Sequence, residues 1–226
     1  MIKMLNRVIK NIAKKIIALQ PAQEIKDADL EYLLWISSLY IQISRIPGHI
    51  AEVGVADGRN TIMFARLIKI FGETSIRQYI GFDTFSGYSE QDLARDKYLI
   101  DNNERWKSNS KNEVLERCVI NNVEDIVELF EGDAVKEIPK ILTQHKGKKF
   151  VPNKAKFALV YIDCNAYGVA LKSMQAFLPY MVPGSIFAVD EKTQGGESEA
   201  MIEFARINKL KIEKPGTNQV PMIIRL

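Results

Sequence analysis

The stretch AEVGVADG, residues 51–58, connects an apolar run at residues 50–55 to a helical pattern at residues 60–71. The short apolar run predicts a buried strand, and the apolar spacing that follows predicts an amphipathic helix. Gly54 and Gly58 permit a tight turn and a close approach of the backbone to a ligand. The stretch therefore predicts a strand, a tight turn and a helix.

The same turn predicts a binding site. A helix N-terminus presents free backbone N–H groups and the positive end of the helix dipole, which suits an anionic group. The glycine spacing differs from the Gly-x-Gly-x-x-Gly pattern of dinucleotide folds, so a pyrophosphate is not the expected ligand of the turn and a nicotinamide dehydrogenase is disfavoured. A carboxylate would suit the amides equally well, and a plain strand-to-helix connection is the alternative.

Strands and helices are expected to alternate along the rest of the chain. The last two apolar runs, 210–212 and 222–226, are joined by a connection too short for a crossover helix, which predicts an antiparallel hairpin. The other expected strands are 78–82, 126–130, 157–162 and 185–189, and the other expected helices are 29–44, 134–142, 169–180 and 197–208. This pattern predicts a Rossmann-like, doubly wound α/β fold with a seven-stranded, mostly parallel sheet.

Length and composition favour one globular domain. The 226 residues suit a single large α/β domain over residues 1–226. No run of about 18 uncharged apolar residues occurs, so we expect no integral membrane span. Cys118 and Cys164 are too few for a disulfide framework, and no Cys/His cluster has zinc spacing, which favours a reducing, cytoplasmic location.

Residues 1–46 form an expected N-terminal helical extension. Apolar spacing over residues 2–17 predicts an amphipathic helix, which would dock on this domain or on a second subunit; binding to an anionic membrane surface is the alternative. Lysines at positions 10, 14 and 15 interrupt the apolar run that a signal peptide would need. We expect a homodimer, because these helices are apolar.

The distribution of charge argues against a nucleic-acid partner. The first twenty residues carry five positive charges and no acid. Because the whole chain carries +3, the remaining residues carry −2. A nucleic-acid-binding protein would instead carry a basic patch across its folded body.

Residues 84–117 fall outside the alternation of strands and helices. They are polar and contain Tyr88, Tyr98 and Trp106. A connection of this length inside a compact domain is commonly a lid or a binding loop. We therefore expect a lid on the acceptor side, with aromatic rings that stack on the acceptor.

Acidic residues follow successive expected strands. In an open α/β sheet, ligands bind beyond the carboxyl ends of the strands. Asp83 follows the second strand, where it could accept hydrogen bonds from ribose hydroxyls. Asp133 follows the third strand in the sequence EGDA, residues 131–134, where it either contacts an adenine ring or caps the next helix.

The next two strands supply a second acidic group. Asp163 and Asn165 follow the fourth strand, and Asp190 and Glu191 follow the fifth. Adjacent strand ends lie about 5 Å apart, so these oxygens can converge, and a cation would neutralise their repulsion. Oxygen ligands without Cys or His suit Mg²⁺, Ca²⁺ or Mn²⁺. Capping of the following segments is the alternative.

The histidines are expected away from this edge. His49 enters the first strand and His145 precedes the fourth, so both belong at the amino ends of the strands. A histidine general base is therefore not expected. Cys164 follows a strand but has no histidine partner, so we do not expect it to be a nucleophile.

These motifs resemble those of known enzymes. Residues 51–58 resemble the first motif of class I S-adenosylmethionine-dependent methyltransferases, with Asp83 at their ribose-binding position. Over residues 48–208 the chain is similar to the macrocin O-methyltransferase (TylF-like) family, which methylates sugars of glycosylated natural products. The motifs that carry this second resemblance are GFDTFSG (81–87), YIDCNAY (161–167), PG (183–184) and AVDE (188–191).

The resemblance implies S-adenosylmethionine as cofactor and a small-molecule acceptor. Glu52, Gly54 and Gly58 would hold the methionine part of the cofactor, Asp83 the ribose, and Asp133 with its neighbour the adenine. The implied cofactor-binding set is Glu52, Gly54, Val55, Ala56, Gly58, Thr61, Asp83, Thr84, Phe85, Gly132, Asp133, Ala134 and Asp163.

The resemblance also implies a metal centre. Asp163, Asp190 and Glu191 match the family's divalent-metal ligands, which orient two neighbouring hydroxyls of the acceptor; Mg²⁺ there would lower the pKa of a bound hydroxyl. The family usually has an Asp pair at the last two positions and often a second Asp at position 165, which looks like the general base in some members. Asn165 cannot take a proton, and we hypothesise that Lys192 or a water removes it instead. The expected catalytic residues are therefore Asp163, Asn165 and Lys192.

Two alternative functions share the cofactor. A catechol-type O-methyltransferase would use the same metal site on an aromatic acceptor. A catalytically inactive S-adenosylmethionine-binding protein would account for Asn165.

Overall fold

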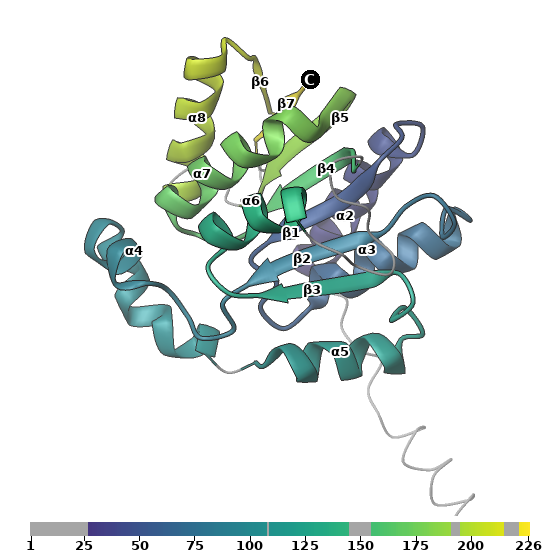
Figure 1. The fold of residues 1–226 in the computed structure, drawn as a ribbon, viewed down its shortest axis with the longest axis horizontal. Helices are drawn as coiled ribbons and strands as arrows, with labels where there is room; N and C mark the ends of the chain where they lie inside the picture. Colours follow the sequence, from purple (N-terminus) through teal and green to yellow (C-terminus); the bar gives the residue numbers. More distant parts are fainter. Residues whose placement is uncertain (1–26, 108, 145–154, 191–194, 215–221) are drawn as a thin grey trace, which may run out of the picture. The chain divides into compact units, whose positions relative to one another are not determined.

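The computed structural model describes residues 27–107, 109–144, 155–190, 195–214 and 222–226 (Figure 1). The chain divides into two compact units, residues 1–35 and 36–226. The described residues of the first unit, 27–35, form the first half of helix α2 (Asp27–Ile43). The helix expected at residues 2–17 lies outside the described residues. None of the helices in the described ranges is long and apolar enough to cross a membrane.

The second unit contains a seven-stranded sheet with the strand order β3-β2-β1-β4-β5-β7-β6 (Figure 1). Strands β1 to β5 pair in parallel, whereas β7 pairs antiparallel with both β5 and β6. The strands are β1 (His49–Val53), β2 (Tyr79–Asp83), β3 (Val127–Glu131), β4 (Phe157–Ile162), β5 (Met181–Val189), β6 (Ile212–Glu213) and β7 (Ile223–Arg225). The predicted fold is confirmed, including the terminal hairpin. Strand β5 begins before the expected residue 185, because Met181 already pairs with Phe157.

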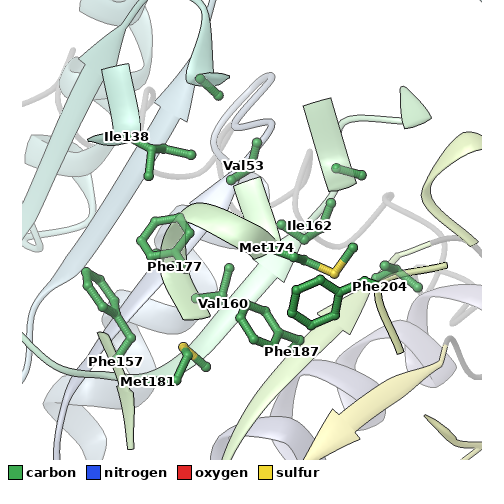
Figure 2. Close-up of a cluster of buried hydrophobic side chains, with 14 of the residues drawn as sticks. Val53, Ile138, Phe157, Val160, Ile162, Met174, Phe177, Met181, Phe187 and Phe204 are labelled. Atoms are coloured by element: carbon green, nitrogen blue, oxygen red, sulfur yellow. The ribbon is translucent and has the colours of Figure 1, made fainter. Parts of the chain in front are cut away.

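Helices cover both faces of the sheet, because the connections between its parallel strands contain helices. Successive side chains of a strand therefore contribute to two different helix–sheet layers. Val160 and Ile162 of β4 lie in one hydrophobic core with Met174 and Phe204 (Figure 2). Tyr161, between them, faces the other layer, where its ring lies 5.7 Å from that of Phe64. The helices of these layers are α3 (Arg59–Ile70), α6 (Ala134–Gln144), α7 (Tyr167–Phe177) with the short 3₁₀ turn η2 (Leu178–Tyr180), and α8 (Gly196–Asn208).

The insertion at residues 84–117 is largely helical, which the sequence pattern did not predict. It contains α4 (Glu90–Arg95) and η1 (Lys97–Lys107) and leads into α5 (Lys111–Ile120). Ser89 and Ser110 each form a capping box with an acid three residues later, which fixes the start of α4 and of α5. Helix α5 is the crossover helix between β2 and β3, so the alternation continues through this segment.

A buried ion pair connects α2 to the segment before β2. Arg77 is 2% exposed, and its Nε lies 2.6 Å from Oε2 of Glu73. Tyr40 of α2 donates a hydrogen bond to the same carboxylate oxygen. The remaining guanidinium nitrogens donate to the backbone carbonyls of Ile43, Ile46 and Gly48. One side chain thus holds the end of α2 and the entry to β1.

We expect Arg77→Ala to destabilise the fold by about 3–5 kcal/mol, because it leaves the buried Glu73 carboxylate and three carbonyls without their donor. Urea unfolding followed by circular dichroism measures this change. Arg66→Ala is the matched control, because Arg66 is exposed and its guanidinium donates to the surface residue Asn121. Equal unfolding midpoints for the two variants would contradict the expectation.

Candidate active site

The ends of five parallel strands meet at one edge of the sheet. The backbone N–H groups of Gly132, Gly54, Asp163 and Asp190 each donate to a carbonyl at the end of a neighbouring strand, at 2.8–2.9 Å. These bonds place the residues that follow β3, β1, β4 and β5 side by side, with Asp83 of β2 among them. The predicted residues Gly54, Asp83, Gly132, Asp163 and Asp190 therefore lie at a common edge of the sheet.

The turn after β1 packs directly on the end of β4. Gly54 has a φ of +94°, and a Cβ at this position would lie 1.9 Å from the carbonyl oxygen of Asp163. Gly58 has a φ of +82° and precedes the first residue of α3. The tight turn therefore requires glycine at both positions, as the sequence predicts. The atoms that approach the two glycines most closely belong to the protein itself and not to a ligand.

Asp83 fastens this turn to β2. Its Oδ2 atom accepts hydrogen bonds from the backbone N–H of Val55 at 2.7 Å and of Ala56 at 2.8 Å. Its Oδ1 atom accepts from the N–H of Phe85 at 2.7 Å. A carboxylate has about four acceptor positions, so roughly one remains on Oδ1. That position suits one ribose hydroxyl.

Glu52 is fully buried on the face of the sheet that α3 covers. The Thr61 hydroxyl lies 3.3 Å from Oε2 of Glu52 and 3.0 Å from the hydroxyl of Tyr79. The Oε1 atom of Glu52 is buried without a hydrogen-bond partner. Burial raises the pKa of this carboxyl well above its usual value, and the negative charge of Asp163 adds to the effect. An unsatisfied acidic oxygen at this edge suits a cationic ligand group.

Asp133 acts as a cap. Its Oδ1 atom accepts a hydrogen bond from the N–H of Val135 at 3.0 Å, and its Oδ2 atom lies 3.3 Å from Nζ of Lys136. The capping alternative is therefore seen, whereas contact with an adenine ring stays a prediction. The neighbouring turn after β2 is held by Thr84, whose hydroxyl donates to the carbonyl of Gly87 at 2.7 Å.

Two of the three predicted metal ligands lie in the described residues. Oδ2 of Asp163 accepts from Nδ2 of Asn60 at 3.0 Å, and Asp190 accepts from the hydroxyl of Tyr161. Glu191 and Lys192 lie outside the described residues. Within those residues, no group of three or more His, Cys, Asp or Glu side chains is arranged to hold a metal ion. The metal centre stays a prediction.

Glu197 is a site residue that the sequence pattern did not reveal. It is fully buried in the first turn of α8 and accepts a hydrogen bond from the backbone N–H of Asn165. The hydroxyl of Tyr98, from the insertion, donates to the carbonyl of Asn165 and accepts from the N–H of Gly196, both at 2.6 Å. Asn165 has a φ of +56°, a conformation that Asn adopts more readily than most residues. The only signal in the sequence was an acid after two glycines.

Neither His49 nor Cys164 supplies a general base at this edge. His49 starts β1 at the opposite edge, and burial lowers its pKa to about 4, so it is neutral. Burial raises the pKa of the Cys164 thiol well above its usual value, so the thiol is protonated. His145 lies outside the described residues.

Comparison with known proteins identifies the fold and its enzyme class. Residues 51–191 match a family described as a methyltransferase domain. The chain belongs to this family. It is an S-adenosylmethionine-dependent O-methyltransferase, as the motifs predict. No curated protein matches the chain.

Solved structures are similar to the methyltransferase over most of its length. The calicheamicin methyltransferase CalS11 is 25% identical, with a TM-score of 0.68 over 88% of this chain and 80% of its own. A second CalS11 structure, described as a TDP-rhamnose 3′-O-methyltransferase, is also 25% identical, with a TM-score of 0.64 over 88% and 81%. The O-methyltransferase NovP is 16% identical, with a TM-score of 0.70 over 84% and 78%. TomG from Streptomyces achromogenes, in complex with S-adenosylmethionine, is 14% identical, with a TM-score of 0.54 over 91% and 82%.

Asp83→Asn is expected to weaken S-adenosylmethionine binding to the methyltransferase by roughly 10–100-fold. An asparagine removes the negative charge from the side chain that would accept a hydrogen bond from the ribose, and a hydrogen bond to a charged group is worth about 1.5–3 kcal/mol. Isothermal titration calorimetry measures the affinity. Asp125→Asn is the control, since Asp125 is an exposed acid that pairs with Lys69. Unchanged affinity in Asp83→Asn would contradict this role.

Glu52→Gln should remove a pH dependence of stability. The folded-state pKa of Glu52 is raised, so the folded protein binds this proton more tightly than the unfolded chain does. Stability is therefore highest below 4.5, the ordinary pKa, and it falls as the pH rises from there through the raised pKa. The fall amounts to about 1.4 kcal/mol for each pH unit that separates the folded and unfolded pKa values.

Urea unfolding at a series of pH values compares Glu52→Gln with the wild type. We expect the variant to lack this fall in stability, while Glu116→Gln, an exposed change on α5, keeps it. Parallel stability curves for Glu52→Gln and the wild type would count against the buried acid as its source.

Proposed function

We propose that this methyltransferase transfers a methyl group to a hydroxyl of a sugar or glycosylated natural product, with the help of a divalent cation such as Mg²⁺. We propose further that it belongs to the macrocin O-methyltransferase (TylF-like) group. The observation that carries the proposal is that Asp83, Asp163 and Asp190 stand at the ends of parallel strands on one sheet edge, beside the glycine turn. The relative CalS11, described as acting on TDP-rhamnose, supports a sugar acceptor.

The residues present fit S-adenosylmethionine. The remaining acceptor position on Oδ1 of Asp83 suits a ribose hydroxyl, and the unsatisfied Oε1 of Glu52 suits the ammonium group of the methionine part. When bound, the cofactor supplies an electrophilic methyl group on a sulfonium. The other residues of the implied cofactor set, in the turns after β1, β2 and β3 and in the first turns of the helices α3 and α6, would complete this site.

The proposed cation site combines Asp163, Asp190 and Glu191. Carboxylate oxygens are the ligand type that Mg²⁺ prefers, and the bound cation would lower the pKa of an acceptor hydroxyl. Asn165 orients the loop through its backbone contacts with Glu197 and Tyr98 rather than by taking a proton. Lys192 or a water would accept the proton of the acceptor.

Four further proposals complete this assignment. The insertion at residues 84–117 would act as the lid over the acceptor, and the 226 residues would form one functional domain with residues 1–46 as its helical extension. The protein would form a homodimer and would work in the cytoplasm. Mass measurement in solution tests the dimer.

Release of S-adenosylhomocysteine from a panel of glycosides, nucleotide-activated sugars and catechols tests the proposal. We expect turnover on a sugar acceptor, its loss on adding a chelator, and recovery with Mg²⁺. Asp163→Asn should reduce turnover by roughly 100-fold, because misplacing the acceptor by about 1 Å has that effect. Asp125→Asn should leave turnover unchanged.

Each other outcome of this assay rejects part of the proposal. Turnover on catechols alone would favour the catechol-type enzyme. Full activity after chelation would remove the metal. Cofactor binding without turnover on any acceptor would favour a catalytically inactive S-adenosylmethionine-binding protein.

A further inference from the structure

A concave site borders the turn after β1. This pocket has a volume of about 400 Å³, within the range of roughly 300–1,000 Å³ that is typical of ligand sites. Its polar and aromatic lining consists of Asp57, Arg59, Arg105, Trp106, Asn109 and Arg117, and we call it the arginine pocket. Of these residues, only Trp106 was singled out in the sequence, as an aromatic residue of the expected lid.

The arginine pocket is assembled from three segments. Asp57 and Arg59 flank Gly58 at the start of α3, Arg105 and Trp106 end η1, and Arg117 comes from α5. The Arg117 guanidinium connects them: its Nη1 donates to the carbonyl of Asp57 at 2.6 Å, and its Nη2 donates to Oδ1 of Asn109 at 3.1 Å. The pocket therefore has a defined frame, and it adjoins both the glycine turn and the insertion.

The lining carries three guanidinium groups and one carboxylate. This local excess of positive charge occurs in a part of the chain, residues 21–226, whose net charge is −2. Arg59 is the first residue of α3, where the helix dipole adds positive potential. All the cations are arginines, whose planar fork of N–H donors matches phosphate oxygens in pairs.

Trp106, the aromatic residue of the lining, suggests that the anionic ligand also contains a nucleobase. The guanidinium carbon of Arg105 lies 4.7 Å from the ring centroid of Trp106. This cation–π contact holds the two side chains together in the last turn of η1. An indole ring in a positively charged pocket is a platform on which a nucleobase stacks, and base stacking is worth roughly 1–3 kcal/mol.

We propose that the arginine pocket binds the diphosphate of a nucleotide-activated acceptor, with the base stacked against Trp106. The proposal rests on the proposed function, because it names the carrier of the sugar that is methylated. The glycine turn is not the phosphate cradle in this arrangement, in agreement with its spacing; the side chains of Arg59, Arg105 and Arg117 bind the diphosphate instead. Binding through the carrier would leave the sugar directed to the carboxylates at the strand ends.

Calorimetric titration with inorganic pyrophosphate, thymidine diphosphate and thymidine tests the pocket directly, without turnover. We expect pyrophosphate to bind and thymidine diphosphate to bind more tightly. Arg59→Ala and Arg105→Ala should each weaken both by roughly tenfold, as expected for loss of a charged hydrogen bond. Both side chains are exposed, so the variants should fold, which thermal unfolding verifies. Arg66→Ala, on the same helix but outside the pocket, should bind as the wild type does.

Trp106→Ala distinguishes a site for nucleotides from a site for free phosphates. It should weaken thymidine diphosphate and leave pyrophosphate unchanged. Equal affinity for pyrophosphate and thymidine diphosphate, with no effect of Trp106→Ala, would identify a site for free phosphates and overturn the nucleotide proposal. Absence of binding, or binding that Arg59→Ala and Arg105→Ala leave unchanged, would overturn the pocket itself.

Methyl transfer is measured separately, so the two proposals can fail independently. Diphosphate binding that depends on the arginines, without methyl transfer to any sugar, would overturn the proposed function alone. Methyl transfer to free sugars without diphosphate binding would overturn this inference alone. If both hold, Arg59→Ala should raise KM for a nucleotide sugar by roughly tenfold and leave kcat unchanged.

Discussion

The contact between Gly54 and the backbone of Asp163 sets the geometry of the whole site. The turn after β1 can lie against the end of β4 only because position 54 has no side chain and adopts a positive φ. Once these two strand ends meet, their backbone hydrogen bonds extend outward to β2 on one side and to β5 on the other. The acidic residues then gather at one edge although they are far apart in the sequence.

Elements with a strong local pattern could be predicted from the sequence. The buried strand at residues 157–162 is uniformly apolar because helices cover both faces, and its bounds agree with β4. The helices of the insertion were missed because their apolar faces are weak, although Ser110 and Glu113 form a readable capping box. Length and polarity alone suggested a loop.

The positions of site residues were easier to predict than their partners. Asp83 lies at the end of β2 as expected, but its hydrogen bonds to Val55 and Ala56 depend on how the turn is oriented in the folded protein. Glu197 and Arg77 were missed for the same reason, since the partner of Glu197 lies 32 residues away and the three carbonyls bound by Arg77 lie 29–34 residues away. No local pattern in the sequence encodes such contacts.

The hydrogen bonds of Asp83 couple the binding of the nucleoside part of a ligand to the binding of its amino-acid part. One carboxylate grips the turn that follows β1 and also offers the free oxygen position at the end of β2. Whatever occupies that position therefore tightens or loosens the turn beside it. Fragments such as adenosine and methionine would then bind with a coupling free energy, each altering the affinity of the protein for the other.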